Sequence, residues 1–150
     1  MNKTLQLRVF RRDGWLCYLC GRPVVFAPAM RLLQESLRHR GYTAPLAYFE
    51  ERYSRDRAPL LDHLAAVIDH KTPRARGGTN DEANLMTACN KCNMRKNDGA
   101  PKEARRPIRT ERGEPKHWDG FSALFTLLAD QDRLVLTPSE REWLRALKAL

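Results

Sequence analysis

The stretch IDHKTPRARGGTNDEANLMTACNKCNMRKND, residues 68–98, carries most of the information in this 150-residue chain. It begins inside a compact apolar run, residues 64–70, that ends in polar residues and predicts a β-strand. Pro73 and the pair Gly77-Gly78 follow, and these residue types predict a loop that turns the chain back.

A second short apolar run, residues 85–88, is placed to be the returning strand. Residues 90–97 are polar, contain no proline or glycine, and are followed by Gly99, which favours a short helix. The stretch therefore predicts a β-β-α unit.

The four cysteines form two C-x-x-C pairs, Cys17 with Cys20 and Cys89 with Cys92. Paired C-x-x-C units in a cytosolic protein indicate a tetrahedral zinc site, because each tight turn directs two thiolates at one ion. Disulfides are disfavoured in that compartment, and a thioredoxin-like site would need one pair in a βαβ context. Four thiolates leave zinc no position for water, so we expect a structural ion.

The flanking sequence predicts mostly helices. Residues 29–40 and 46–56 have helical periodicity and are interpreted as an insertion at about 27–58. Residues 121–129 also favour a helix, and a final helix begins with a capping box at Thr137. Residues 1–22 are interpreted as a short basic segment leading into the first cysteine turn, and residues 98–117 as an extended arm.

Lys and Arg outnumber Asp and Glu by 27 to 18, which gives a net charge of +9. The excess is concentrated at residues 71–112, where eleven basic residues face five acidic ones. A concentrated positive charge favours a polyanionic partner, with nucleic acid first. No apolar run approaches membrane-spanning length, and the charged start does not resemble a signal peptide, so we expect a cytoplasmic protein.

These motifs resemble the HNH endonucleases, whose ββα-metal motif is often held in a treble-clef zinc frame. The resemblance rests on FRRDGWLCYLCG and on IDHKTPRARGGTNDEANLMTACNKCNMRKND, about a third of the chain. The family pattern is a strand ending in Asp-His, then a proline, a glycine-rich turn, an asparagine before the second strand, and His or Asn after the second C-x-x-C. Its positions fall here on Asp69, His70, Pro73, Gly77, Gly78, Asn84 and Asn93.

The resemblance implies a role for each polar position. His70 would be the general base, Asp69 and Asn93 would hold a catalytic Mg²⁺ or Mn²⁺, and Asn84 would tie the loop that orients His70. Asn93 stands where the family more often has His, which leaves open which metal is preferred. The products would carry a 5′-phosphate and a 3′-hydroxyl.

The pair Asp-His occurs twice, at Asp62-His63 and at Asp69-His70. Only His70 has the proline and the two glycines in register, so it is the catalytic candidate. We expect His63 to be a surface or packing residue that strand geometry points away from His70.

Basic residues around the motif are the expected phosphate contacts. They are Lys71, Arg74, Arg76, Lys91, Arg95 and Lys96. Each alone could equally be a solvated charge, and their grouping around the motif favours binding.

The sequence thus predicts an α+β protein: a zinc-braced, treble-clef-like ββα-metal nuclease core in residues 1–112 and a helical extension in 113–150, packed on the same unit. It predicts a metal-dependent endonuclease acting on nucleic acid, DNA more than RNA. Two alternatives stay open at this point. One is a non-catalytic zinc module that binds DNA or RNA, and the other is an interaction or self-association surface on the helix containing Trp143.

Overall fold

The computed structural model describes residues 1–42, 60–97, 118–131 and 133–150. Its core unit is a two-stranded antiparallel sheet of β1 (Ala66–His70) and β2 (Leu85–Cys89), followed directly by helix α4 (Asn90–Asn97). The register pairs Ala66 with Cys89 and His70 with Leu85. The predicted β-β-α unit and the α+β class are confirmed.

Two short 3-10 turns shape the connection between the strands, η2 (Arg74–Arg76) and η3 (Glu82–Asn84). Gly77 ends η2 in a left-handed conformation, with φ of 81°. A side chain would be strained in that conformation. The predicted turn therefore contains a left-handed backbone position, and glycine occupies it.

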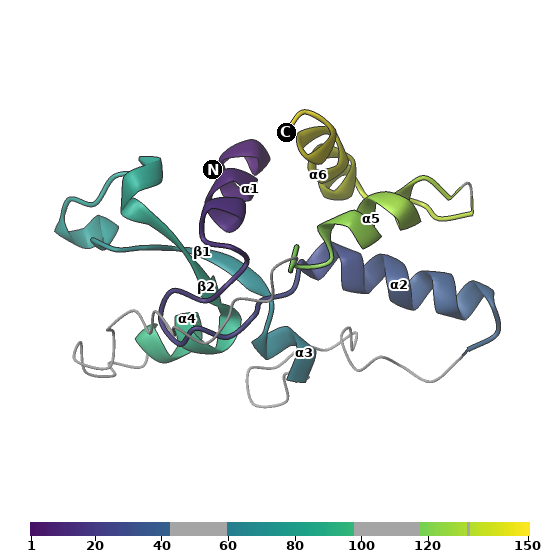
Figure 1. Cartoon of the computed structure of the whole chain (residues 1–150), viewed down its shortest axis with the longest axis horizontal. Coiled ribbons are helices and arrows are strands. Elements are labelled where there is room, and N and C mark those ends of the chain that lie inside the picture. The colour runs from purple at the N-terminus through teal and green to yellow at the C-terminus, as the bar shows by residue number, and fades with distance from the viewer. Residues whose placement is uncertain (43–59, 98–117, 132) are drawn as a thin grey trace.

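Helix α1 (Lys3–Arg12) occupies the region that the sequence suggested was only a basic segment, so that interpretation was wrong. Asn2 caps it by accepting a hydrogen bond from the backbone N–H of Leu5 at 2.8 Å. Its inner face contributes Leu7 and Phe10 to the core. Helices α1 and α4 lie on either side of the sheet (Figure 1).

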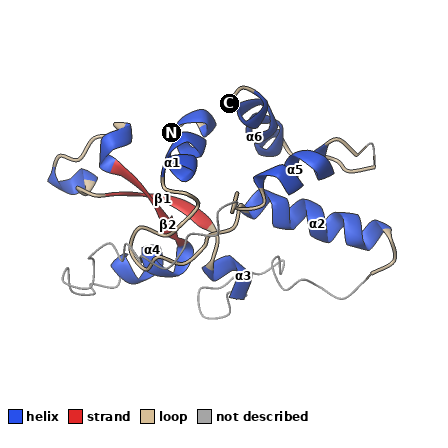
Figure 2. Ribbon diagram, in the orientation of Figure 1, coloured by secondary structure: helices blue, strands red, loops and turns tan. Residues whose placement is uncertain are grey.

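Of the remaining described helices, α2 (Ala27–His39), α5 (Ser122–Ala129) and α6 (Pro138–Lys148) form the other half of the molecule, and the short α3 (Leu60–His63) lies beside α4 (Figure 2). Helix α2 packs on α5, and α6 packs on both α1 and α5. The capping box predicted at Thr137 is present, with Glu140 as its reciprocal partner. The predicted helix at 46–56 and arm at 98–117 lie outside the described residues.

One hydrophobic cluster connects the two halves. Phe26 is at its centre: its ring lies edge-on to those of Trp15, Phe125 and Trp143 at centroid distances of 5.9, 5.1 and 5.1 Å. Trp143 is 8% exposed and faces this core. The Trp143 indole, which suggested an interaction surface, is thus packed against other residues of the same chain.

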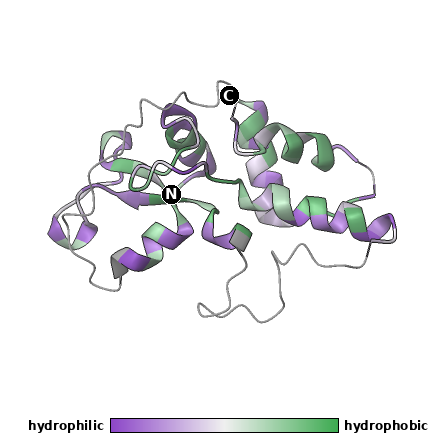
Figure 3. Cartoon of the chain, turned by 60° about the horizontal axis from the view of Figure 1, so that its bottom comes forward, coloured by the Kyte–Doolittle hydropathy of each residue, from purple (hydrophilic) through white to green (hydrophobic). Residues whose placement is uncertain are grey.

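Hydropathy follows the same division. Hydrophobic residues predominate in α5, whereas the loop side of the sheet is mainly hydrophilic (Figure 3). Among the helices that the structure describes, none has the length and apolar character needed to cross a bilayer.

Candidate metal centre and HNH site

The four cysteines come together in one cluster, with all sulfur atoms within 4.8 Å of one another. The Sγ atoms of Cys20 and Cys89 are 3.9 Å apart. A tetrahedral zinc with Zn–S bonds near 2.3 Å requires sulfur–sulfur distances of about 3.8 Å. The cluster therefore fits a zinc ion, as the sequence predicted.

Backbone contacts hold the two cysteine pairs in place. The first pair lies in a turn in which Gly21 donates to the carbonyl of Cys17 at 2.7 Å, and Tyr18 donates to the carbonyl of Thr87 at 2.8 Å. The second pair joins β2 to α4, where the backbone N–H of Cys92 points at the Cys89 sulfur at 3.4 Å. The first turn thus lies along β2, beside the second pair.

The four thiols influence one another strongly. Hydrogen bonds from Cys17 and Cys89 lower the pKa of Cys20, whereas burial and the nearby Cys17 raise the pKa of Cys92. A cation bound among the four sulfur atoms would stabilise their thiolate forms.

Asp69 and His70 end strand β1. The Asp69 carboxylate is buried, and its Oδ1 accepts a hydrogen bond from the backbone N–H of His70 at 2.7 Å. The side chain opposite Ile68, Thr87, contacts α1 by donating to the carbonyl of Val9 at 3.4 Å. Because side chains alternate along a strand, Asp69 is on the opposite, α4 side of the sheet.

Asn93 is in the middle of α4, on the helix that packs against both strands, and its side chain is half-buried. The sheet alternation and the position of α4 thus put Asp69 and the helix that carries Asn93 on the same side of the sheet. The resemblance would have these two residues hold a divalent ion.

Asn84 connects two parts of the loop. Its Oδ1 accepts from the backbone N–H of Thr72 at 2.8 Å, and its Nδ2 donates to the carbonyls of Thr72 and Thr79 at 3.2 and 2.8 Å. Its own carbonyl accepts from the backbone N–H of Lys71 at 2.8 Å. Through these bonds Asn84 connects the residues that follow His70 to the far side of the turn.

His63 is in helix α3, so the argument that placed it along a continuous strand with His70 was wrong. Its neighbour Asp62 accepts a hydrogen bond from the Asn90 side chain at 2.8 Å and so connects α3 to the start of α4. The first Asp-His pair therefore belongs to a helical turn that packs beside the β-β-α unit.

The predicted phosphate contacts fall into different environments. Arg74, Arg76 and Arg95 are exposed, and Lys91 is half-buried on α4. The Lys71 ammonium instead donates to the carbonyl of Ala83 at 2.8 Å and lies 5.7 Å from the ring centre of Tyr18. The Lys96 side chain lies outside the described residues.

Sequence reasoning missed two polar residues near the site. Arg12 donates to the carbonyls of Glu82 and Leu85 at 2.7 and 2.8 Å, and the adjacent Asp13 raises its pKa. Asn80 contacts the ring of His70, with 2.9 Å between Oδ1 and Nε2. The local sequence does not single out either residue. Arg12 bonds to a segment that is distant in sequence, and Asn80 lies within a polar turn.

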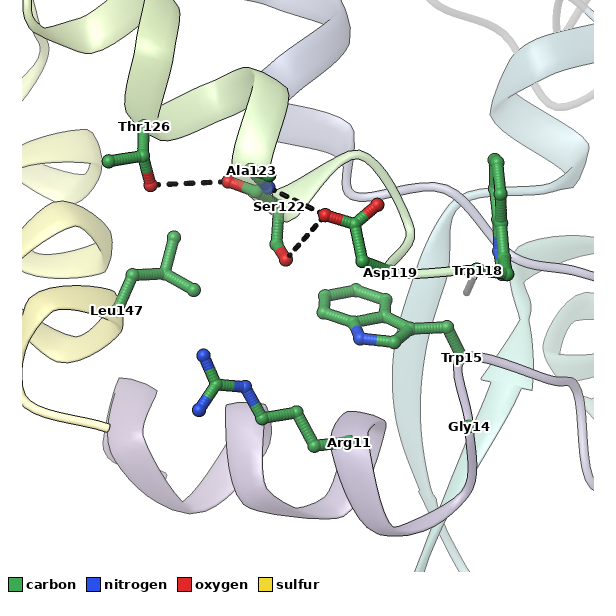
Figure 4. Close-up of a pocket in the computed structure, with 9 residues that line it drawn as sticks. All are labelled: Arg11, Gly14, Trp15, Trp118, Asp119, Ser122, Ala123, Thr126 and Leu147. Atoms are coloured by element: carbon green, nitrogen blue, oxygen red, sulfur yellow. Dashed lines mark hydrogen bonds between the residues drawn. The ribbon is translucent and has the colours of Figure 1, made fainter. Parts of the chain in front are cut away.

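One pocket of about 440 Å³ is located elsewhere, between α1, α5 and α6 (Figure 4). Arg11, Trp15 and Trp118 line it, and none of its lining residues is a predicted site residue. The carboxylate of Asp119 faces α5, where it accepts from the backbone N–H of Ala123 at 2.7 Å. Asp119, a polar residue that lines the pocket, is thus used to cap the N-terminus of α5.

Residues 58–99 match the family model described as HNH endonuclease. No curated protein and no solved structure gives a significant match to the chain. The matched residues contain β1, both 3-10 turns, β2, α4 and the second cysteine pair. The resemblance noted in the sequence is confirmed for residues 58–99, which match the HNH endonuclease domain.

Proposed function

We propose that this protein is a metal-dependent endonuclease that hydrolyses phosphodiester bonds in DNA, with His70 as the general base. The HNH segment already suggests nuclease activity on nucleic acid. The observation that supports the finer assignment is the position of His70 at the exit of β1, directly after buried Asp69 and beside a loop held by Asn84.

Hydrolysis of a phosphodiester requires a water to lose a proton as it attacks phosphorus. Histidine is suited to that task because its imidazole can accept a proton near neutral pH. His70 is followed by an exposed loop, so an extended substrate can reach it from the loop side of the sheet. Asn84 then contributes by holding that loop.

Asp69 and Asn93 would hold a divalent cation, Mg²⁺ or Mn²⁺, through carboxylate and carboxamide oxygens. When bound, such an ion neutralises the charge that develops on the phosphate. The burial of the Asp69 carboxylate on the α4 side supports this assignment, because a buried carboxylate is more stable beside a cation.

DNA would be held mainly through its phosphates. Arg74 and Arg76 are in η2, on the loop that follows the catalytic candidate, and Arg95 is on α4. All three are exposed. Cations on the loop that follows His70 and on α4 support a phosphate-binding surface around the HNH segment.

The decisive experiment offers zinc-loaded protein a supercoiled plasmid, linear duplex DNA, single-stranded DNA and an RNA oligonucleotide. Each is incubated with Mg²⁺, with Mn²⁺, and without added divalent metal, which avoids a chelator that would strip the zinc. We expect cleavage of DNA that depends on the added metal. Binding without cleavage in every condition would favour the non-catalytic alternative.

Two matched variants test the assignment of the base. His70→Ala should lower the cleavage rate by about 10² to 10⁴ while zinc content and DNA affinity stay unchanged. His63→Ala removes the other Asp-His histidine and should cut like the parent. A folded His63→Ala that is inactive, next to an active His70→Ala, would reverse the assignment.

A further inference from the structure

The contact between His70 and Asn80 bears on which nitrogen of the His70 ring carries the proton, as well as on the position of the ring. The Asn80 Oδ1 lies 2.9 Å from the His70 Nε2. A carboxamide oxygen can only accept a hydrogen bond, so with the Asn80 Oδ1 assigned to this contact the Nε2 atom is the donor and carries the proton. Neutral imidazole has a single N–H proton, and its lone pair is then on Nδ1.

Asn80 is held by the residues on both sides of it. The carbonyl of Thr79 accepts from the Asn84 side chain at 2.8 Å. The Thr79 hydroxyl donates to the Asp81 carboxylate at 2.7 Å. The backbone at Asn80 is therefore restrained, which lets a short side chain be directed at one ring nitrogen.

His70 is restrained from the other direction. It ends the strand ladder opposite Leu85, and the next residue, Lys71, donates from its backbone to the carbonyl of Asn84 at 2.8 Å. Asn84 thus holds both partners of the contact, His70 through Lys71 and Asn80 through Thr79. Asn84 can therefore orient the His70 ring indirectly, through the backbone of these neighbouring residues.

We propose that Asn80 is a positioning residue that holds His70 in the tautomer with its proton on Nε2, so that Nδ1 is the atom that accepts the proton from water. The assignment of Nδ1 as the base rests on the proposed function. The tautomer itself rests only on the Asn80 contact.

In the cleavage step, Nδ1 takes one proton from water, and the water oxygen bonds to phosphorus. The bond from phosphorus to the leaving 3′ oxygen breaks, and its electron pair stays on that oxygen, which takes a proton from solvent. The imidazolium keeps its Nε2–H bond to Asn80 throughout and later returns the Nδ1 proton to solvent. Asn80 therefore holds the ring in the same orientation before and after proton transfer.

The tautomer can be measured without any activity. Long-range ¹H–¹⁵N spectra of the zinc-loaded full chain distinguish the two nitrogens of each imidazole, and with four histidines in the chain His70→Ala identifies the His70 signals. In neutral His70 we expect Nε2 to be protonated. Asn80→Ala should shift both His70 nitrogens toward a mixture of tautomers, whereas Asn80→Asp, which retains an oxygen acceptor, should keep the parent pattern.

Glu82→Gln is the matched control, because it weakens the Arg8–Glu82 ion pair in the same loop without touching His70. It should leave the His70 signals unchanged. Protonation of Nδ1 in the parent, or an Asn80→Ala spectrum identical to the parent's, would overturn the inference.

Cleavage kinetics separate this inference from the proposed function. Asn80→Ala should slow single-turnover cleavage by on the order of tenfold or more with DNA affinity unchanged, and Asn80→Asp should restore part of the rate. If the parent shows the Nε2–H tautomer but cuts nothing, the proposed function fails and the tautomer assignment stands. If Asn80→Ala loses the tautomer yet cuts at the parent rate, the positioning role is wrong.

Discussion

A Cβ atom added at Gly78 would lie 1.9 Å from the carbonyl oxygen of Thr72. That carbonyl also accepts a hydrogen bond from Asn84. The close approach of backbone at Gly78 is therefore part of the same loop that orients His70, and it explains why the second glycine of the turn has no side chain.

Gly78→Ala should disrupt the loop, because the new methyl group would displace backbone rather than a movable side chain. We expect cleavage to fall by at least tenfold, together with a loss of stability above that of Gly77→Ala. At Gly77 a Cβ meets no atom within 4 Å, and only its positive φ opposes the change, at a cost of about 1 kcal/mol. Chemical denaturation and plasmid cleavage of both variants check this. Equal effects would show that the Thr72 contact is unimportant.

Zinc removal should unfold the core. Zinc sites of this kind contribute on the order of 10 kcal/mol in small modules, and this cluster joins the N-terminal turn to the β2–α4 junction. Elemental analysis should give about one zinc per chain. Cys20→Ser should lose zinc and its cooperative thermal transition, and zinc returned to the stripped parent should restore folding. A metal-free protein that still unfolds cooperatively would contradict the prediction.

The buried Glu140 should stabilise the fold through Arg31, which donates to both carboxylate oxygens. Burial acts to raise the pKa of Glu140, but the bonds from Arg31 and Thr137 hold it below its usual value. Glu140→Gln should lower the free energy of unfolding at pH 7 by about 2 kcal/mol. Glu35→Gln breaks the exposed Arg38–Glu35 pair and should cost at most about 0.5 kcal/mol.

The same pair predicts a pH dependence. Because the folded pKa of Glu140 lies below the unfolded value near 4.3, its contribution is fully present above that pH and is lost as the pH falls through the folded pKa. The stability difference between parent and Glu140→Gln should therefore shrink as the pH is lowered below about 4.3. Zinc content is measured at each pH, and the two proteins are compared where both retain zinc, so the difference isolates Glu140. A difference that is constant with pH would exclude this linkage.

DNA affinity should depend on salt through the cations near His70. Replacing Arg74 and Arg76 with Ala should reduce the slope of log affinity against log salt by about two, roughly one for each phosphate that the variant no longer neutralises. Arg133→Ala with Arg145→Ala removes the same charge from exposed positions in the α5–α6 connection and in α6. Helices α5 and α6 lie away from the loop between β1 and β2 (Figure 1). That control should leave the slope nearly unchanged. Equal reductions would show that only net charge matters.

Several features followed from local sequence alone. The strand–turn–strand–helix order, the turn at Gly77, the helix predicted at 29–40 and found at 27–39, and the capping box at Thr137 each depend on residues close together in the chain. The sequence also showed which cysteines would share a zinc ion, because a tetrahedral four-cysteine site needs all four cysteines of the chain. His70 could be distinguished from His63 by its spacing to the glycines, although its proposed role stays untested.

Only the tertiary structure decided which groups surround His70 and its loop. Helix α1 looked like a basic segment because its apolar residues gain their partners from β2 and from α6, which is more than a hundred residues away. Arg12 reaches Leu85 across 73 positions, and Asn80 meets His70 only because Asn84 folds the loop back. Periodicity and spacing report on contacts within a few residues, whereas hydrogen bonds across such separations depend on the path of the whole chain.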